Sequence, residues 1–171
     1  KGIDDAINAI QILSEKGINV KFHILGSGKL KSDYKKIING LNLTNNIKFD
    51  GVLSGGNEVN LWLDCLDLYI QPSRTEGLPR SLIEAMARGL PAVASNVGGI
   101  PELLTSDHLV QSNSPHELAA KIEKFINSQQ LRYEQGKKNY DKAKEYDSSV
   151  LKLRRAKFWN QAKAIVEKDL K

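Results

Sequence analysis

The chain has 171 residues, of which 40% are hydrophobic and 26% are charged, a balance typical of one globular domain with its own core. No apolar run approaches the roughly 20 residues that cross a bilayer, and no signal-peptide pattern opens the sequence, which argues against membrane-spanning and secreted classes. Cys65 is the only cysteine and lies in an apolar run, so we exclude an internal disulfide and expect a buried, reduced thiol in a cytoplasmic protein.

The first third of the chain predicts a helix, a strand and a second helix. Apolar residues recur at helical spacing over 4–16, and Gly17 can take the left-handed conformation that ends a helix. An apolar, β-branched run at 20–25 predicts a strand. A Gly-Ser-Gly turn at 26–28 then leads into a helix predicted over 30–41.

This turn has two interpretations. Asp50 lies 22 residues past Gly28, near the place of the ribose-binding acid in a dinucleotide site, but Lys31 stands where that fingerprint has its third glycine. A tight turn between Gly26 and Gly28 with no ligand is the plainer alternative. His23, inside the preceding strand, is interpreted as a core histidine rather than a catalyst.

The middle of the chain continues to alternate strands with helices. Further strands are predicted at 47–49, 67–71, 91–95 and 108–111, with short helices at 58–66 and near 101. Five strands alternating with helices predict an α/β fold with a doubly wound parallel sheet. Ligands bind at the carboxyl ends of the strands in such a sheet, so the loop after residue 49 is a candidate binding segment.

The stretch 71–104 carries the strongest functional pattern. Pro79 suits a first helical position and Gly89 can close a helix, so a helix is predicted between them. Glu76 then lies before the helix N-terminus, where free N–H groups and the helix dipole favour an anion, and Glu84 lies inside the helix. A phosphate between these two carboxylates would make a nucleotide-sugar site.

A structural interpretation of the same helix stands beside this one. Arg80, Glu84 and Arg88 follow one another at a spacing of four, which suits a solvent-exposed ladder of ion pairs. Met86 and Ala87 are predicted to be core residues.

The length of the pattern decides between them. It follows P-S-x-x-E-G-x6-E-A-M-A-x-G-x-P-V-V-A-x3-G-G-x-P-E, and the matching residues are Pro72, Ser73, Glu76, Gly77, Glu84, Ala85, Met86, Ala87, Gly89, Pro91, Val93, Ala94, Gly98, Gly99, Pro101 and Glu102, with Ala92 in place of the first valine. This pattern closely resembles the C-terminal, donor-binding domain of retaining GT-B glycosyltransferases of the group 1 family. The resemblance implies a Rossmann-like domain of an enzyme that transfers a sugar, for example in polysaccharide or lipopolysaccharide biosynthesis.

The resemblance also implies roles for individual residues. Glu76 would bind hydroxyls of the donor sugar and steady positive charge at the reacting carbon, and Glu84 would hold the ribose. Gly77 and Leu78 would present backbone N–H groups, and Lys1 would pair with the pyrophosphate. The other donor-binding residues that it implies are Gly26, Gly28, Val52 and Leu53. A disordered chain end is the alternative for Lys1, and a turn-forming glycine is the alternative for Gly77.

The expected donor is a UDP-, GDP- or ADP-sugar. Histidines and carboxylates show no metal-ligand spacing, so no metal and no cofactor are expected. Arg74 could reach a phosphate or could be a surface arginine. The family's N-terminal domain, which would bring a glycan or lipid-linked acceptor, is not in this sequence, so we expect the chain alone to transfer nothing. A non-catalytic sugar-nucleotide-binding module, a GT-B-fold epimerase and a dinucleotide-dependent dehydrogenase remain as alternatives.

The last part of the chain is predicted to be helical. Ser114, Pro115 and Glu117 have the spacing of a capping box, and further helices are expected at 131–145 and from 148. We expect a Rossmann-like domain over 1–147 and, over 148–171, a helix that would return toward the absent N-terminal domain. Its apolar stripe is Leu151, Phe158, Trp159, Ala162, Ile165 and Val166.

Positive charge gathers in the same region. Residues 131–171 contain 12 Lys or Arg and 6 Asp or Glu, whereas the whole chain has a net charge of +5. A solvated helix and an anionic membrane surface both suit such a tail. We expect no nucleic-acid partner, a cytoplasmic location and, as an open alternative, peripheral contact with the cytoplasmic face of a membrane.

One departure from the family concerns the sheet. The resemblance implies six strands, the first of which would lie just before Lys1 and would be central in a doubly wound order. Only five are predicted here, so the expected first strand is missing and the sequence leaves open how the domain is stabilised.

Overall fold

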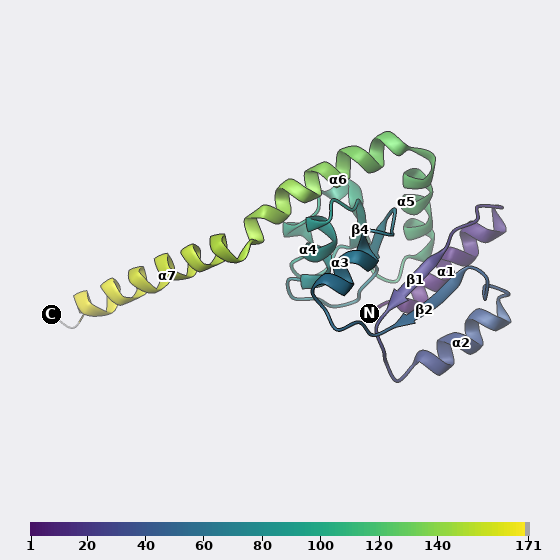
Figure 1. Cartoon of the computed structure of the whole chain (residues 1–171), viewed down its shortest axis with the longest axis horizontal. Coiled ribbons are helices and arrows are strands. Elements are labelled where there is room, and N and C mark those ends of the chain that lie inside the picture. Colours follow the sequence, from purple (N-terminus) through teal and green to yellow (C-terminus); the bar gives the residue numbers. More distant parts are fainter. Residues whose placement is uncertain (170–171) are drawn as a thin grey trace.

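The computed structural model of the chain describes residues 1–169, in which strands and helices alternate before a helical C-terminal part (Figure 1). The strands are β1 (Phe22–Leu25), β2 (Ile47–Gly51), β3 (Tyr69–Gln71), β4 (Ala92–Ser95) and β5 (Leu109–Val110). The helices are α1 (Ile3–Glu15), α2 (Lys31–Gly40), α3 (Asn57–Leu63), α4 (Arg80–Ala87), α5 (Pro115–Asn127), α6 (Gln129–Ala143) and α7 (Ser148–Asp169), with 3-10 turns η1 (Ile100–Glu102), η2 (Ser106–His108) and η3 (Lys144–Tyr146). The predicted α/β fold with parallel strands is confirmed.

The strands form two parallel sheets instead of one. β1 pairs with β2, and β4 lies between β3 and β5. Two cavities, of about 600 and 510 Å³, are each lined by residues of both β1 and β3, so these two strands border a common gap. In the doubly wound order 3-2-1-4-5-6, the strands that flank the first one correspond to β1 and β3 here. The sheet is therefore interrupted where the missing strand was expected.

Helices join the two sheets through a shared core. Figure 1 shows α1 and α5 beside the sheets, and the two helices pack against each other. Their buried side chains meet those of both sheets in one cluster that includes Ile7, Ile10, Leu13, Ile24, Ile47, Val93, Val110, Leu118, Ile122 and Phe125. Full burial of one such side chain contributes about 1.5–3 kcal/mol, so the cluster holds the halves together without strand pairing across the gap.

Helix α4 covers a second cluster beside β4. Leu82 and Met86 of the helix pack with Ala92 and Ala94 of the strand and with Ile100 of η1. This packing fixes the helix that carries Glu84 against β4, all four residues of which are buried.

Local predictions were mostly right at helix ends. Gly17 and Gly89 have φ of 76° and 73°, as expected of residues that close helices. Helix α4 begins one residue later than predicted because Pro79 has an extended ψ of 113°. The capping box was wrong: the side chain of Ser114 makes no capping bond to α5, and Glu117 instead accepts from the N–H of Gln111 at 2.8 Å.

Three predictions about where side chains point, two about burial and one about ion pairs, were wrong. Cys65 is exposed, because it follows the end of α3 in a turn, where its thiol donates a hydrogen bond to the carbonyl of Leu61. Ala87 is exposed while its neighbour Met86 is buried, since adjacent helical residues point about 100° apart. The ion-pair ladder on α4 does not form, because Arg88 binds Asp64 in two hydrogen bonds of 2.7 Å.

Helix α7 extends away from the body of the molecule (Figure 1). The side chains of Phe158, Trp159, Ile165 and Val166 are exposed on it, which matches the predicted apolar stripe without a covering partner in the described part of the chain. No helix within residues 1–169 is long and apolar enough to span a membrane. The division of the chain at residue 147 stays a prediction.

Candidate functional site

A cleft of about 600 Å³ lies at the carboxyl ends of β1 and β3, the edge where parallel sheets bind ligands. The turn after β1, the end of β3 and the helix α4 each form part of its wall. The lining residues that matter below are Lys1, Gly26, Gly28, Gln71, Ser73, Ser81 and Glu84. Four predicted donor-binding residues, Lys1, Gly26, Gly28 and Glu84, are thus brought to one cleft.

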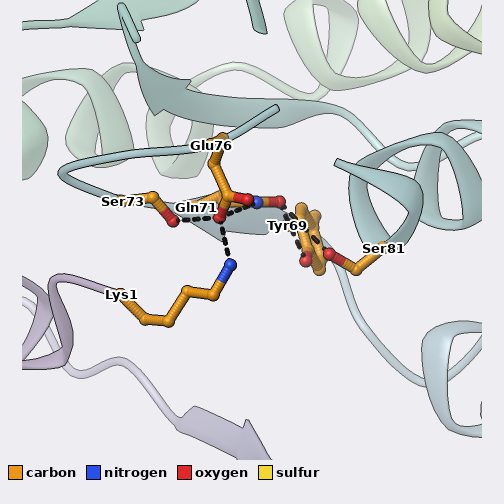
Figure 2. A network of polar contacts seen from close by, with 6 residues as sticks. All are labelled: Lys1, Tyr69, Gln71, Ser73, Glu76 and Ser81. Atoms are coloured by element: carbon orange, nitrogen blue, oxygen red, sulfur yellow. Dashed lines mark hydrogen bonds and ion pairs between the residues drawn. The ribbon is translucent and has the colours of Figure 1, made fainter. Parts of the chain in front are cut away.

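Glu76 stands at the centre of a polar network beside this cleft (Figure 2). Its Oε1 accepts hydrogen bonds from Lys1 Nζ at 2.6 Å, Ser73 Oγ at 2.7 Å and Gln71 Nε2 at 2.9 Å. Lys1 reaches the carboxylate from the N-terminal segment, whereas Ser73 and Gln71 come from the end of β3 and the loop after it. Lys1 and Glu76, each predicted to bind a different part of the donor, therefore contact each other although 75 residues separate them.

The environment of Glu76 keeps its carboxyl ionised. Only 9% of the side chain is exposed, and this burial raises the pKa. Hydrogen bonds from Lys1, Ser73 and Gln71 act in the opposite direction and outweigh burial, so the pKa lies below that of an ordinary glutamate. The group is a carboxylate at neutral pH, suited to accept hydrogen bonds from hydroxyl groups or to stabilise nearby positive charge.

Glu84 is exposed on α4 and faces the cleft. Arg88, one turn later on the helix, binds Asp64 and therefore does not form the predicted ion pair with Glu84. The first N–H groups of the same helix, from Arg80 onward, lack intrahelical acceptors and favour an anion. One helix thus offers an anion-binding end and, a turn later, a carboxylate that can accept from hydroxyls.

Two glycines allow the backbone approaches that shape the site. A Cβ on Gly2, whose φ is 67°, would lie 1.8 Å from the carbonyl oxygen of Pro72, and one on Gly98, whose φ is 54°, would lie 1.9 Å from that of Glu76. The following Gly99 donates its N–H to the carbonyl of Gly77 at 2.8 Å. The loop after β4 and the N-terminal segment therefore pack directly on the loop that carries Glu76, which explains glycine at these positions.

The side chain of Arg74 helps to hold these segments together and is therefore not available to bind a phosphate. Its guanidinium binds Asp4 at 2.5 Å and Asp5 at 3.2 Å, and its Nε donates to Asn113 at 2.5 Å. The hydrogen bond from Arg74 is the main cause of the lowered pKa of Asp4. The arginine fastens the Glu76 loop to the start of α1.

The remaining predicted residues lie outside the cleft lining. Gly77 and Leu78 belong to the loop of Glu76, and Val52 and Leu53 to the loop after β2, but none of the four is among the residues that line the cleft. The side chain of Val52 is 69% exposed. Their roles stay predictions, because backbone groups at such loops can still reach a ligand.

Asp50, weighed from the sequence as a ribose-binding acid, lies near the end of β2 and is largely shielded from solvent. Asp50 Oδ2 accepts from Trp62 Nε1 at 2.9 Å and contacts His23 Nδ1 at 2.7 Å, while Lys48 lies 2.9 Å from Oδ1. Burial raises the pKa of Asp50, but these partners lower it to about 2. Hydrogen-bond partners occupy Oδ2, and Oδ1 has the Lys48 ion pair but no hydrogen bond, so the ribose-binding role considered for Asp50 is disfavoured. The interpretation of His23 as a core histidine was wrong, because its side chain is 33% exposed and lines the cleft, although its ring has Asp50 as a partner.

Within residues 1–169, no group of three or more His, Cys, Asp or Glu side chains is placed to hold a metal ion. The charged side chains at or beside the cleft are Glu76, Glu84 and the lysines Lys1, Lys29 and Lys31.

Comparisons with known proteins identify the family of the chain. The family model described as "Glycosyl transferases group 1" matches residues 1–142. The Staphylococcus aureus protein CapJ is 32% identical over 166 residues, covering 97% of this chain and 42% of CapJ. The Erwinia amylovora amylovoran biosynthesis glycosyltransferase AmsK is 38% identical over 110 residues, covering 61% of this chain and 27% of AmsK.

A solved structure extends the likeness to three dimensions. The structure of S. aureus TarM with UDP and alpha-GlcNAc-glycerol has a TM-score of 0.78 and 28% identity, covering 88% of this chain and 31% of TarM. The chain spans less than half the length of the curated relatives named above. Because the family model covers more than half of the chain, the chain belongs to the glycosyl transferases group 1 family.

Proposed function

We propose that this chain is the donor-binding part of a retaining glycosyltransferase that uses a nucleoside-diphosphate sugar. The observation that carries the proposal is the placement of an ionised Glu76, a second carboxylate on Glu84 and the amine of Lys1 around one cleft at the carboxyl edge of a parallel sheet. TarM, a similar protein, has been solved with UDP, which supports a uridine nucleotide among the candidate donors.

Each charged group has a task in this proposal. The pyrophosphate lies at the N-terminus of α4, where Lys1 exchanges its contact with Glu76 for a phosphate oxygen, and Glu84 accepts from the ribose hydroxyls. Glu76 then accepts from a sugar hydroxyl and stabilises positive charge at the reacting carbon. Lysine and helix N–H groups stabilise the departing diphosphate, so the reaction relies on fixed electrostatics and needs no metal ion.

The rest of the enzyme lies outside the two half-sheets. The gap between β1 and β3 takes a further parallel strand, and an N-terminal domain supplies the glycan or lipid-linked acceptor. The exposed stripe of α7 packs on that domain, at the cytoplasmic face of a membrane. The chain alone binds donor weakly and transfers no sugar. Detectable transfer by the purified 171-residue chain would overturn this part of the proposal.

Calorimetric titration with UDP, GDP, ADP and NAD tests the donor site. We expect one nucleoside diphosphate to bind, and Glu84→Ala to weaken it by roughly tenfold, since a hydrogen bond to a charged group contributes about 1.5–3 kcal/mol. Glu134→Ala, which removes an exposed carboxylate on α6, is the matched control and leaves binding unchanged. Binding of NAD alone would favour a dehydrogenase. Failure of every nucleotide to bind, both to this chain and to a version extended by a strand, would reject the donor site.

A further inference from the structure

Gln71 is a polar residue at a position that parallel strands usually fill with an apolar one. It is the last residue of β3, and only 7% of it is exposed. A buried amide destabilises a fold unless its hydrogen bonds are made inside the protein. The partners of Gln71 therefore indicate why an amide is present.

The amide connects two parts of the site. Its Nε2 donates to Glu76 Oε1 at 2.9 Å, while its Oε1 accepts from Tyr69 Oη at 3.2 Å and from Ser81 Oγ at 3.4 Å (Figure 2). These contacts fix which way the amide faces, because the reverse orientation would set its carbonyl oxygen against the Glu76 carboxylate. Ser81 lies in the first turn of α4, so the chain of contacts runs from that helix through Gln71 to Glu76.

The three donors on Glu76 all bind the same oxygen. Lys1, Ser73 and Gln71 converge on Oε1, and no described side chain donates to Oε2. The side chain of Lys1 is 71% exposed, whereas Ser73 and Gln71 are buried. Two rigid donors thus hold one oxygen and set the direction of the other.

We propose that Gln71 is a positioning residue, which holds Glu76 by Oε1 so that Oε2 is presented to a hydroxyl of the donor sugar. This inference rests on the proposed function, since the sugar is its ligand. Tyr69 and Ser81 act one step further back by holding the amide. Loss of Gln71 leaves Glu76 in place but frees its carboxylate to rotate.

The pKa of Glu76, measured by NMR with ¹³C-labelled glutamate, tests the contact without any ligand. Gln71→Leu removes a donor to the charged form, so we expect the pKa of Glu76 to rise, and Gln71→Glu to raise it further by adding a second carboxylate. Gln130→Leu, which removes an exposed Gln–Glu bond of 2.7 Å on α6, is the control and leaves Glu76 unchanged. An unmoved pKa in folded Gln71→Leu would overturn the proposal.

Sugar binding supplies a second readout. UDP-glucose and GDP-mannose are compared with UDP and GDP, and we expect Gln71→Leu to abolish the extra affinity due to the sugar while the diphosphate binds as before. Equal weakening of sugar and diphosphate would contradict positioning of Glu76. If no nucleotide binds either the unaltered chain or the version extended by a strand, the proposed function fails, and the pKa of Glu76 still decides whether Gln71 holds it.

If Gln71→Leu does not fold, a second variant tests the same contacts. The double variant Tyr69→Phe with Ser81→Ala keeps Gln71 and Glu76 but removes both hydroxyls that hold the amide. We expect a smaller rise in the pKa of Glu76 than in a variant without the amide. No change in this variant, in a folded protein, would also count against the proposed chain of contacts.

Discussion

The two half-sheets of this domain differ in how completely they are buried. All four residues of β4 are buried, between α4 on one side and the shared core on the other. Strands β1 and β2 are mostly half-buried, and β1 borders the gap. The half with β3 and α4 carries Glu84 on a packed helix and Glu76 in the loop before that helix. The half with β1 and β2 contributes the turn after β1 to the cleft. Burial on both faces of a sheet thus accompanies the two glutamates of the site, whereas Lys29 and Lys31 line the cleft from the half with β1 and β2.

The largest effect expected from this difference concerns two glycines with positive φ. Gly98 packs on the Glu76 loop in the buried half, and Gly55, with φ of 93°, has open space around it after β2. We expect Gly98→Ala to destabilise the fold by about 3 kcal/mol or more, because its methyl group must displace backbone. Gly55→Ala costs only the strain of a left-handed residue, about 1–2 kcal/mol.

Urea unfolding of both variants measures this contrast. A Gly98→Ala chain no less stable than Gly55→Ala would show that the approach of the two loops does not constrain the site. The free energies are compared at equal denaturant slopes, so that a change in the unfolded state is not mistaken for loss of contacts.

Asp50, in the half with β1 and β2, is expected to give a second, smaller effect on stability. The pKa of Asp50, about 2 in the fold, is below its value in an unfolded chain, so its stabilisation is complete near neutral pH and disappears as pH falls through that value. We expect Asp50→Asn to cost about 2 kcal/mol near pH 7 and progressively less toward pH 3, as followed by urea unfolding. A gap between the two proteins that stays constant with pH would contradict the lowered pKa.

The smallest effect belongs to the surface of the buried half. Arg88 and Asp64 tie α4 to the end of α3, but both side chains are more than a third exposed. We expect Arg88→Met to cost about 1 kcal/mol or less, since solvent screens such pairs. Thermal unfolding checks this, with Lys142→Met as a control that removes the ion pair between Lys142 and Glu145. A loss of stability well above about 1 kcal/mol for Arg88→Met would contradict the expected screening and assign the α3–α4 contact a greater part in holding the site.

Sequence periodicity and turn chemistry were enough to predict the alternation of strands and helices. Gly17 and Gly89 close helices as expected, because a left-handed cap is a local property. The direction of a side chain at the end of an element is less local. Cys65 lies in an apolar run yet is exposed, since α3 ends two residues earlier.

The pairing of site residues was predictable only in part. Glu76 and Glu84 were assigned through the motif, and the structure places both at or beside one cleft. Gln71 was not singled out, because an amide at the end of a strand gives no signal until its neighbours are known. The contacts of Arg74 with Asp4 and of Asp50 with His23 likewise join residues far apart in sequence, which spacing cannot show.

The most direct test of a donor site formed by both half-sheets is a ¹H–¹⁵N NMR titration with the nucleoside-diphosphate sugar that binds best. We predict that shifts appear together at Gly26 and Gly28 after β1 and at Gly77, Leu78 and Glu84 beside α4, on the two sides of the gap. Shifts confined to one half-sheet, or to α7, would contradict a site that the two halves share.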